Sequence, residues 1–236
     1  MTINVSGNDK RLEVADIEFI GATGKIEAHQ ARLKGDEKHP GVVVIHENRG
    51  LNPHTRDVAR RMALEGFIAI APNALSPLGG TPDDTDEARN LMSQLDPDKN
   101  IKNFIAAVKY LKTHPQATGK VGVTGFCWGG GVTNQVAVNS SDVQAAVPFY
   151  GRQPSKEDVR RIKAAMLIHY AEDDERINAG IPEFEKALKE AGVDYKIYMY
   201  PNAQHAFFND TGSRYNPEAA MLAWKRTIEF FKEKLK

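Results

Sequence analysis

The stretch of sequence that decides the fold is Thr124-Gly-Phe-Cys127-Trp-Gly-Gly-Gly131. It follows a short apolar run at 121–123 and precedes a helical pattern, so it reads G-x-C-x-G between a strand and a helix. A turn that pushes its central side chain outward in strained geometry leaves no room for neighbouring Cβ atoms, which requires Gly125 and Gly129. We interpret it as a nucleophile elbow that presents the thiol of Cys127 at a helix N-terminus, where the helix dipole favours the thiolate.

Two other interpretations of this turn are weaker. A free cysteine is among the most buried residue types, so Cys127 alone would suggest a structural residue, but its place between strand and helix favours catalysis. A dinucleotide-binding loop would need a glycine at this position, and the chain contains no G-x-x-x-x-G-K-[ST] sequence. The turn therefore predicts a cysteine nucleophile, with the backbone amide of Trp128 as an oxyanion donor.

The rest of the chain alternates short apolar runs with helical patterns. Two extended stretches around Gly21-Ala-Thr-Gly24 predict an N-terminal β-hairpin. Later apolar runs lie at 41–45, 67–71, 121–123, 145–147, 165–168 and 196–200, and helical patterns lie at 53–65, 97–112, 128–139, 181–191 and 217–235. This alternation predicts an α/β-hydrolase fold, a mostly parallel sheet with helices on both faces and the antiparallel hairpin at its edge. With 236 residues, we expect a single domain over 1–236.

An acid and then a histidine follow the nucleophile in this fold, and both types occur at the ends of late strands. The acidic cluster Glu172 to Glu175 comes after the run at 165–168, and His205 comes after the run at 196–200. Singly, an acidic cluster is usually a solvated loop and a loop histidine usually has no catalytic role. In this order, however, the three residue types predict a triad in which the acid orients His205 beside Cys127.

The segment after the run at 41–45 is the place where this fold supplies a second oxyanion amide. We assign that amide to Asn48. The side chain of Glu47 is expected near the thiol, although Glu47 and Arg49 could instead form an ion pair at the strand end.

Composition indicates a small-molecule partner. Lys plus Arg equals Asp plus Glu at 31 each, so no net charge favours nucleic acid or an anionic membrane. No apolar run approaches the roughly 18 residues of a membrane span, and the N-terminus lacks the apolar segment of a signal peptide. We expect a cytoplasmic monomer or homodimer. A zinc motif H-E-x-x-H starting at His46 would need histidine at Gly50, and we expect no metal and no cofactor.

Taken together, these motifs resemble the dienelactone hydrolase family. They are Gly-Phe-Cys127-Trp-Gly-Gly, Glu47 at a strand end, the acid motif around Asp174, and Gln204-His205. The resemblance runs from about Gly24 to the C-terminus and implies a compact α/β hydrolase with a Cys-Asp-His triad that acts on lactones and esters without a cofactor. The resemblance also favours Asp174 over Asp173 as the acid of the triad, because the spacing of the residues after Asp174 fits the family. It also implies that Glu47 contacts the resting thiol and is displaced by substrate.

Substrate choice is where the chain departs from the resemblance. The best-studied members hold a substrate carboxylate with arginines, one of them shortly after the histidine, where this chain has Asn209. We therefore expect uncharged esters and lactones as substrates, unless an arginine from another strand end replaces the clamp. Candidate substrate-binding residues, each as compatible with packing as with binding, are Arg49, Phe149, Tyr150, Arg152, Phe207 and Phe208.

Two other classes of function stay open from sequence alone. The chain could be a small-molecule-binding protein that keeps the hydrolase fold without turnover. It could also use a reactive thiol for redox chemistry or acyl transfer, although the absence of a second cysteine weakens the redox alternative.

Overall fold

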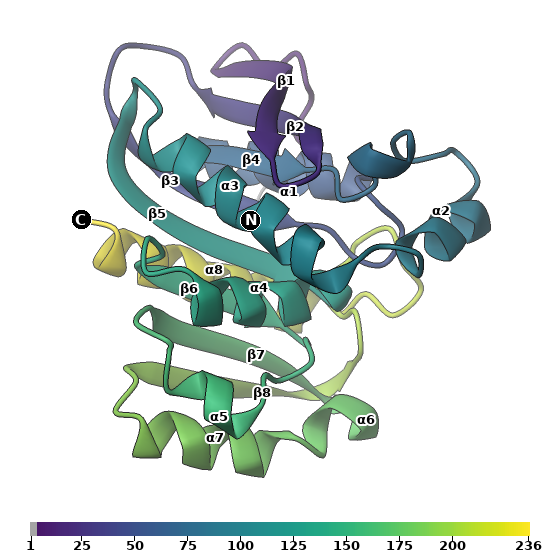
Figure 1. Ribbon diagram of the computed structural model, residues 1–236, viewed down its shortest axis with the longest axis vertical. Coiled ribbons are helices and arrows are strands. Elements are labelled where there is room, and N and C mark those ends of the chain that lie inside the picture. Colours follow the sequence, from purple (N-terminus) through teal and green to yellow (C-terminus); the bar gives the residue numbers. More distant parts are fainter. Residues whose placement is uncertain (1–3) are drawn as a thin grey trace.

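The computed structural model describes residues 4–236 and is organised around an eight-stranded sheet (Figure 1). From top to bottom in Figure 1 the strands follow the order β1-β2-β4-β3-β5-β6-β7-β8. β1 pairs antiparallel with β2 and β2 with β4, whereas the remaining pairs are parallel. The strands are β1 (Leu12–Gly21), β2 (Gly24–Leu33), β3 (His39–Ile45), β4 (Ile68–Pro72), β5 (Ala117–Phe126), β6 (Ala145–Phe149), β7 (Ala165–Asp173) and β8 (Tyr195–Gln204).

The predicted architecture is confirmed, including the N-terminal hairpin at the sheet edge. Residues 1–3 of the expected domain lie outside the described residues. Within residues 4–236 no helix is both long enough and apolar enough to cross a membrane.

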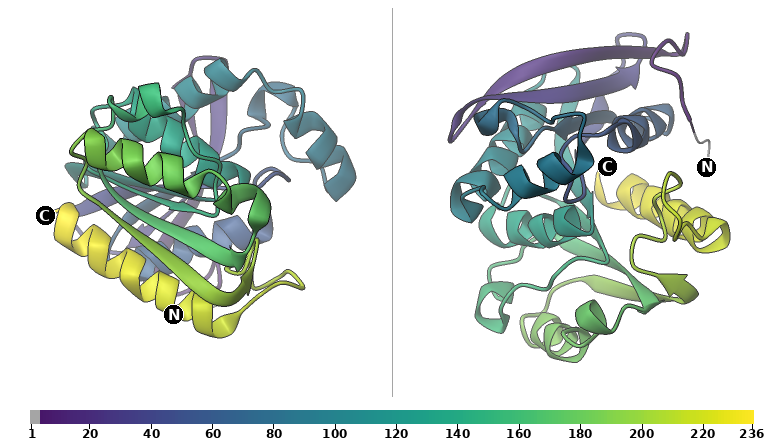
Figure 2. Two further views of the ribbon diagram at one scale, coloured as in Figure 1. Left: turned by 90° about the horizontal axis from the view of Figure 1, so that it is seen from below. Right: turned by 90° about the vertical axis from the view of Figure 1, so that its right-hand side faces the viewer.

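Helices cover both faces of the sheet (Figure 2). They are α1 (Pro53–Leu64), η1 (Ser76–Leu78), α2 (Thr85–Met92), α3 (Pro97–Lys112), α4 (Trp128–Asn139), α5 (Lys156–Val159), α6 (Glu175–Asn178), α7 (Ile181–Glu190) and α8 (Pro217–Lys234). The sequence pattern did not predict α2, α5 or α6. The helices α5 and α6 have four residues each, which are too few to show a helical period.

Alternate residues of the central strands pack into two separate cores. Val43 and Ile45 face the core that contains side chains of α3, α4 and α7, while Val42 and Val44 face the core of α1 and α8. All four strand residues are fully buried. Burial on both faces explains why this strand is a continuous apolar run rather than an alternating one.

Candidate active site

Cys127 lies at the sharp turn between β5 and α4, with a φ of 56° and a ψ of −116°. A Cβ atom on Gly125 would lie 2.3 Å from the carbonyl oxygen of Gly129, and one on Gly129 would lie 2.4 Å from that of His46. Real Cβ atoms do not approach backbone oxygens so closely, so the two glycines are required for the strained turn. The turn leaves the thiol half-buried at the edge of the sheet.

His205 lies between Cys127 and Asp174 and bonds to both. Its Nε2 is 3.0 Å from the Sγ of Cys127, and its Nδ1 is 2.5 Å from the Oδ2 of Asp174. The loop that follows β8 carries His205, whereas Asp174 directly follows β7. Asp174 is only 8% exposed, while its neighbour Asp173 is exposed and pairs with Gln204 in the sheet. Of the two candidate acids, Asp174 is therefore the one beside His205.

The surroundings of His205 favour its protonated form. Burial lowers the pKa of this ring, but the hydrogen bonds and negative charges of Asp174 and Cys127 outweigh burial and raise it to about 9. The protonated ring therefore lies 3.0 Å from Sγ, within hydrogen-bonding distance of the sulfur.

The loop after β3 carries Asn48 and Glu47, and His46 fixes its course. The ring of His46 stacks on Trp128, with centroids 5.4 Å apart, and burial lowers its pKa to about 4. Its Nε2 accepts from the amide of Ala74 at 3.2 Å, so Nδ1 carries the proton and donates to the carbonyl oxygen of Glu47 at 2.6 Å. Sequence reasoning missed this role, because the motif search considered His46 only as a metal ligand.

Glu47 does not contact the thiol as the family resemblance implied. Its Oε2 accepts a 2.7 Å hydrogen bond from the Nδ2 of Asn209, and its Oε1 is buried without a partner among residues 4–236. The alternative ion pair with Arg49 does not form either. The carboxylate is directed to Asn209, while the thiol contacts His205.

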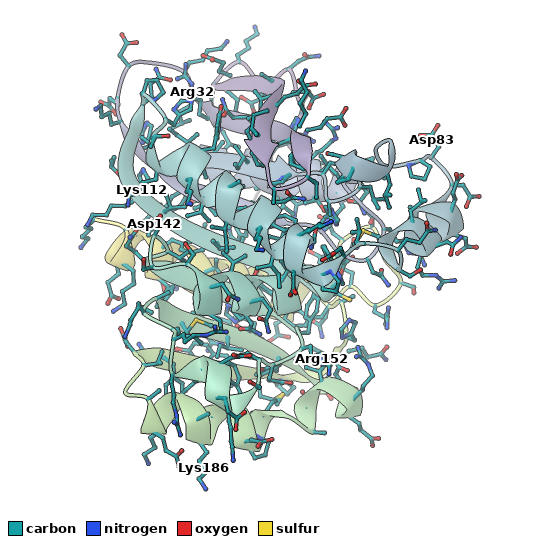
Figure 3. All side chains as sticks on the ribbon, viewed as in Figure 1. Arg32, Asp83, Lys112, Asp142, Arg152 and Lys186 are labelled. Carbon is teal, nitrogen blue, oxygen red and sulfur yellow. The ribbon has the colours of Figure 1, made fainter. Side chains whose placement is uncertain are left out.

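A cavity of about 790 Å³ lies against the thiol. Cys127, Trp128 and His205 line one end of it, together with Asn48 and Tyr150. Arg152, which lies near α6 in Figure 3, lines the wall of the cavity. So does Arg176, which sequence reasoning did not single out because its short helix α6 was not predicted.

Four expected substrate-binding residues do not line the cavity. Phe149 is 1% exposed, and Phe207 and Phe208 are fully buried in the core with α8. Phe208 stacks on Phe126, with centroids 4.9 Å apart, so its ring is a packing element. Arg49 also lies outside the cavity lining. For Phe149, Phe207 and Phe208, the packing alternative is therefore the one that the structure shows.

The sheet order, the elbow and the sequence of side chains at the strand ends define an α/β hydrolase. The chain belongs to the dienelactone hydrolase family, whose sequence pattern it matches over residues 26–235. No cluster of three His, Cys, Asp or Glu side chains within the described part of the chain is arranged to hold a metal ion.

Individual relatives agree with this assignment. The chain is 33% identical to a protein of Saccharolobus solfataricus named "Putative carboxymethylenebutenolidase", over 81% of this chain and 88% of that one. It is 39% identical to "Protein usf" of Aquifex pyrophilus, over 83% and 89% of the two chains. A solved structure from Klebsiella pneumoniae, described as a "Putative Dienelactone Hydrolase", superposes with a TM-score of 0.85 at 26% identity, over 94% of this chain and 99% of that one.

Proposed function

We propose that the protein hydrolyses carboxylic esters or lactones with Cys127 as nucleophile, His205 as general base and acid, and Asp174 as the residue that orients His205. The observation that supports this most is the unbroken line of contacts from Sγ to Nε2 at 3.0 Å and from Nδ1 to Oδ2 at 2.5 Å, at one end of the cavity. A thiol in the middle of a domain core would have neither an imidazole partner nor a cavity.

In the first half of the reaction, the thiolate of Cys127 attacks the carbonyl carbon of the substrate. The backbone amides of Asn48 and Trp128 donate to the oxyanion that forms. When the tetrahedral intermediate collapses, the C–O bond breaks and the imidazolium of His205 gives its proton to the leaving alkoxide. A lactone opens at this step and stays attached to the enzyme as a thioester.

In the second half, His205 takes a proton from water, whose oxygen attacks the thioester carbon. Collapse breaks the C–S bond, releases the carboxylic acid and restores the thiolate beside the imidazolium. Asp174 keeps the proton of His205 on Nδ1 while the ring is neutral in the acyl-enzyme. No step needs a metal or an organic cofactor.

Glu47 is assigned an electrostatic role in nucleophile activation, without contact to Sγ in this structure. Its Oε1 is buried without a partner among residues 4–236, while Asn209 holds its other oxygen. Because a buried carboxylate disfavours a second negative charge in the same region, displacement of Glu47 on substrate binding would favour the thiolate.

The test is the turnover of an activated aryl ester such as p-nitrophenyl acetate by the wild type and by Cys127→Ala. The expected result is turnover by the wild type and loss of it in the variant, with a cooperative melting transition in both proteins. A wild type that binds esters without turnover would indicate the binding-protein alternative. Full activity in Cys127→Ala would refute the assignment of the nucleophile.

A further inference from the structure

A cluster of four buried ionisable side chains lies behind the proposed catalytic residues. It consists of His54, Asp57 and Arg61 on α1 and of Asp210, and is called here the anchor cluster. Their side chains are 3%, 7%, 1% and 6% exposed in that order. None of the four lines the cavity.

Asp210 is held by two of these residues. Its Oδ1 is 2.9 Å from the Nδ1 of His54, and its Oδ2 accepts from the guanidinium of Arg61 at 2.5 Å. Arg61 also donates through Nε to Asp57 at 2.8 Å. Burial raises the pKa of Asp210, but the hydrogen bonds of His54 and Arg61 outweigh burial and lower it to about 2. The carboxylate therefore stays ionised near neutral pH.

Asp210 belongs to the loop that carries His205. This segment, residues 205–216, is called here the histidine loop. Asn209, directly before Asp210, binds Glu47 through Nδ2 and accepts through Oδ1 from the amide of Thr211 at 3.0 Å. Ala206, directly after the histidine, has a φ of 70°, which is unfavourable for a residue with a Cβ atom. The surrounding contacts must stabilise that conformation.

The same helix is tied to the other half of the proposed site. Helix α1 begins shortly after the loop with Glu47 and Asn48, and the side chain of Asn52 caps it by accepting from the amide of Thr55 at 3.0 Å. Helix α1 is therefore directly connected in sequence to the loop that carries the proposed oxyanion amide. Through Asp210, the same helix holds the histidine loop.

We propose that Asp210 is a positioning residue that fixes the histidine loop on α1, and thereby sets the distance between His205 and Cys127 and the contact between Asn209 and Glu47. Buried ion pairs add little net stability but strongly favour one geometry. Asp210 thus acts through His205 and does not touch substrate. This inference rests on the proposed function, because it assigns Asp210 a role in the reaction of that site.

The matched pair Asp210→Asn and Asp57→Asn tests the inference. Both carboxylates are equally buried and contact Arg61, but Asp57 accepts from the backbone amide of Val5 at 2.6 Å and has no contact with the histidine loop. For Asp210→Asn we expect kcat to fall about tenfold with KM within about twofold of wild type, since a misplacement of about 1 Å can reduce rates about a hundredfold. Asp57→Asn is expected to lower the melting temperature and to leave both constants within about twofold.

The rate of alkylation of Cys127 by iodoacetamide at pH 7 gives a second readout that needs no turnover. Asp210→Asn is expected to slow it at least about threefold, because an imidazolium displaced from Sγ no longer favours the thiolate. If Asp210→Asn does not fold, His54→Phe replaces it. That variant keeps an aromatic ring beside Phe126 and Phe208 and removes one hydrogen bond from Asp210. It is expected to lower the alkylation rate and kcat by about half of the logarithmic change expected for Asp210→Asn.

Two results would overturn the inference. One is a folded Asp210→Asn protein whose kcat and alkylation rate match wild type, and the other is Asp57→Asn reproducing the changes of Asp210→Asn, which would make the cluster merely structural. Failure of the proposed function has a different signature, which is turnover by Cys127→Ala. The alkylation comparison then still decides the role of Asp210.

Discussion

Replacement of Asp174 by asparagine is the sharpest test of the hydrogen bonds that connect Cys127, His205 and Asp174, because Asp173→Asn supplies a control one residue away. The Oδ2 of Asp174 is 2.5 Å from the Nδ1 of His205, while the exposed side chain of Asp173 has no contact with the ring. The asparagine side chain has nearly the same volume as aspartate. Asp174 is also the N-cap residue of α6 but makes no side-chain capping bond, so the helix loses nothing by the change.

The size of the effect follows from the charge on His205. The rise in its pKa from 6.5 to about 9 corresponds to about 3 kcal/mol of preference for the imidazolium, and solvent screening of this partly exposed ring reduces that to about 2 kcal/mol. Asp174 makes the largest contribution that raises this pKa, and Cys127 makes the rest, so losing up to this amount from a transition state that contains the imidazolium slows the reaction by up to about 30-fold through charge alone. The Nδ2 of asparagine can also donate to Nδ1 and stabilise the wrong tautomer, which sets an upper limit near a factor of about 10⁴.

The assay is kcat/KM for an aryl ester at pH 7, with a melting curve for each variant. We expect a loss of about 30-fold to about 10⁴-fold for Asp174→Asn and less than about twofold for Asp173→Asn. The reverse ranking would move the orienting role to Asp173, and a loss below about fivefold in both variants would refute the triad. Those limits separate the outcomes clearly.

The free energy of unfolding should depend on pH, and the direction of that dependence follows from the raised pKa of His205. Because the folded-state pKa of His205 is raised, its contribution is fully present below pH 6.5 and disappears as the pH rises through about 9. The difference in free energy of unfolding between wild type and Asp174→Asn should therefore be largest below pH 6.5 and shrink progressively between pH 6.5 and about 9. A difference that grows with pH would contradict the raised pKa.

The elbow glycines, Glu47 and the arginine of the cavity wall give further tests. In urea unfolding, Gly129→Ala should lower the free energy of unfolding by at least about 2 kcal/mol. A Cβ on Gly131 would have its nearest neighbour at 3.5 Å, so Gly131→Ala should leave this free energy unchanged or raise it by up to about 1 kcal/mol. Equal effects of the two substitutions would contradict the close approach at the turn. Glu47→Gln should speed alkylation of Cys127 by iodoacetamide at pH 7 by about threefold or more, and an unchanged rate would remove the carboxylate from thiol activation. The expected preference for uncharged substrates is tested by comparing kcat/KM for two substrates that differ only in a free carboxylate versus its methyl ester. The expectation is wrong if the carboxylate substrate is preferred and if Arg152→Ala, but not Arg49→Ala, removes that preference.

The fold could be predicted from the sequence because its signals are local. The hairpin around Gly21-Ala-Thr-Gly24 and the buried run at 41–45 each show their structure within a few residues. The strained turn at Cys127 is visible because only glycine is tolerated on both sides of it. The order of acid and histidine after the nucleophile follows from the order of the strands.

The interior of the site could not be predicted in the same way, because its contacts join distant residues. Glu47 and Asn209 are 162 positions apart, and nothing in either segment indicates that they meet. Phe207 and Phe208 are candidates for substrate binding from the sequence because they lie near a predicted strand end, but a loop has no fixed period that tells which side chains turn inward. Phe208 instead packs against α8, where its ring is 6.0 Å from that of Trp224.

Asn209 affects how charge is balanced at the site. Its amide donates a hydrogen bond to Glu47 but carries no positive charge, so it supplies no counter-charge to that side chain. In the proposed mechanism the positive charge beside a thiolate at Cys127 has to come from the imidazolium of His205, which its contacts with Asp174 and Cys127 maintain up to a pH of about 9. On that proposal nucleophile activation depends on Asp174, so Asp174→Asn should also slow alkylation of Cys127.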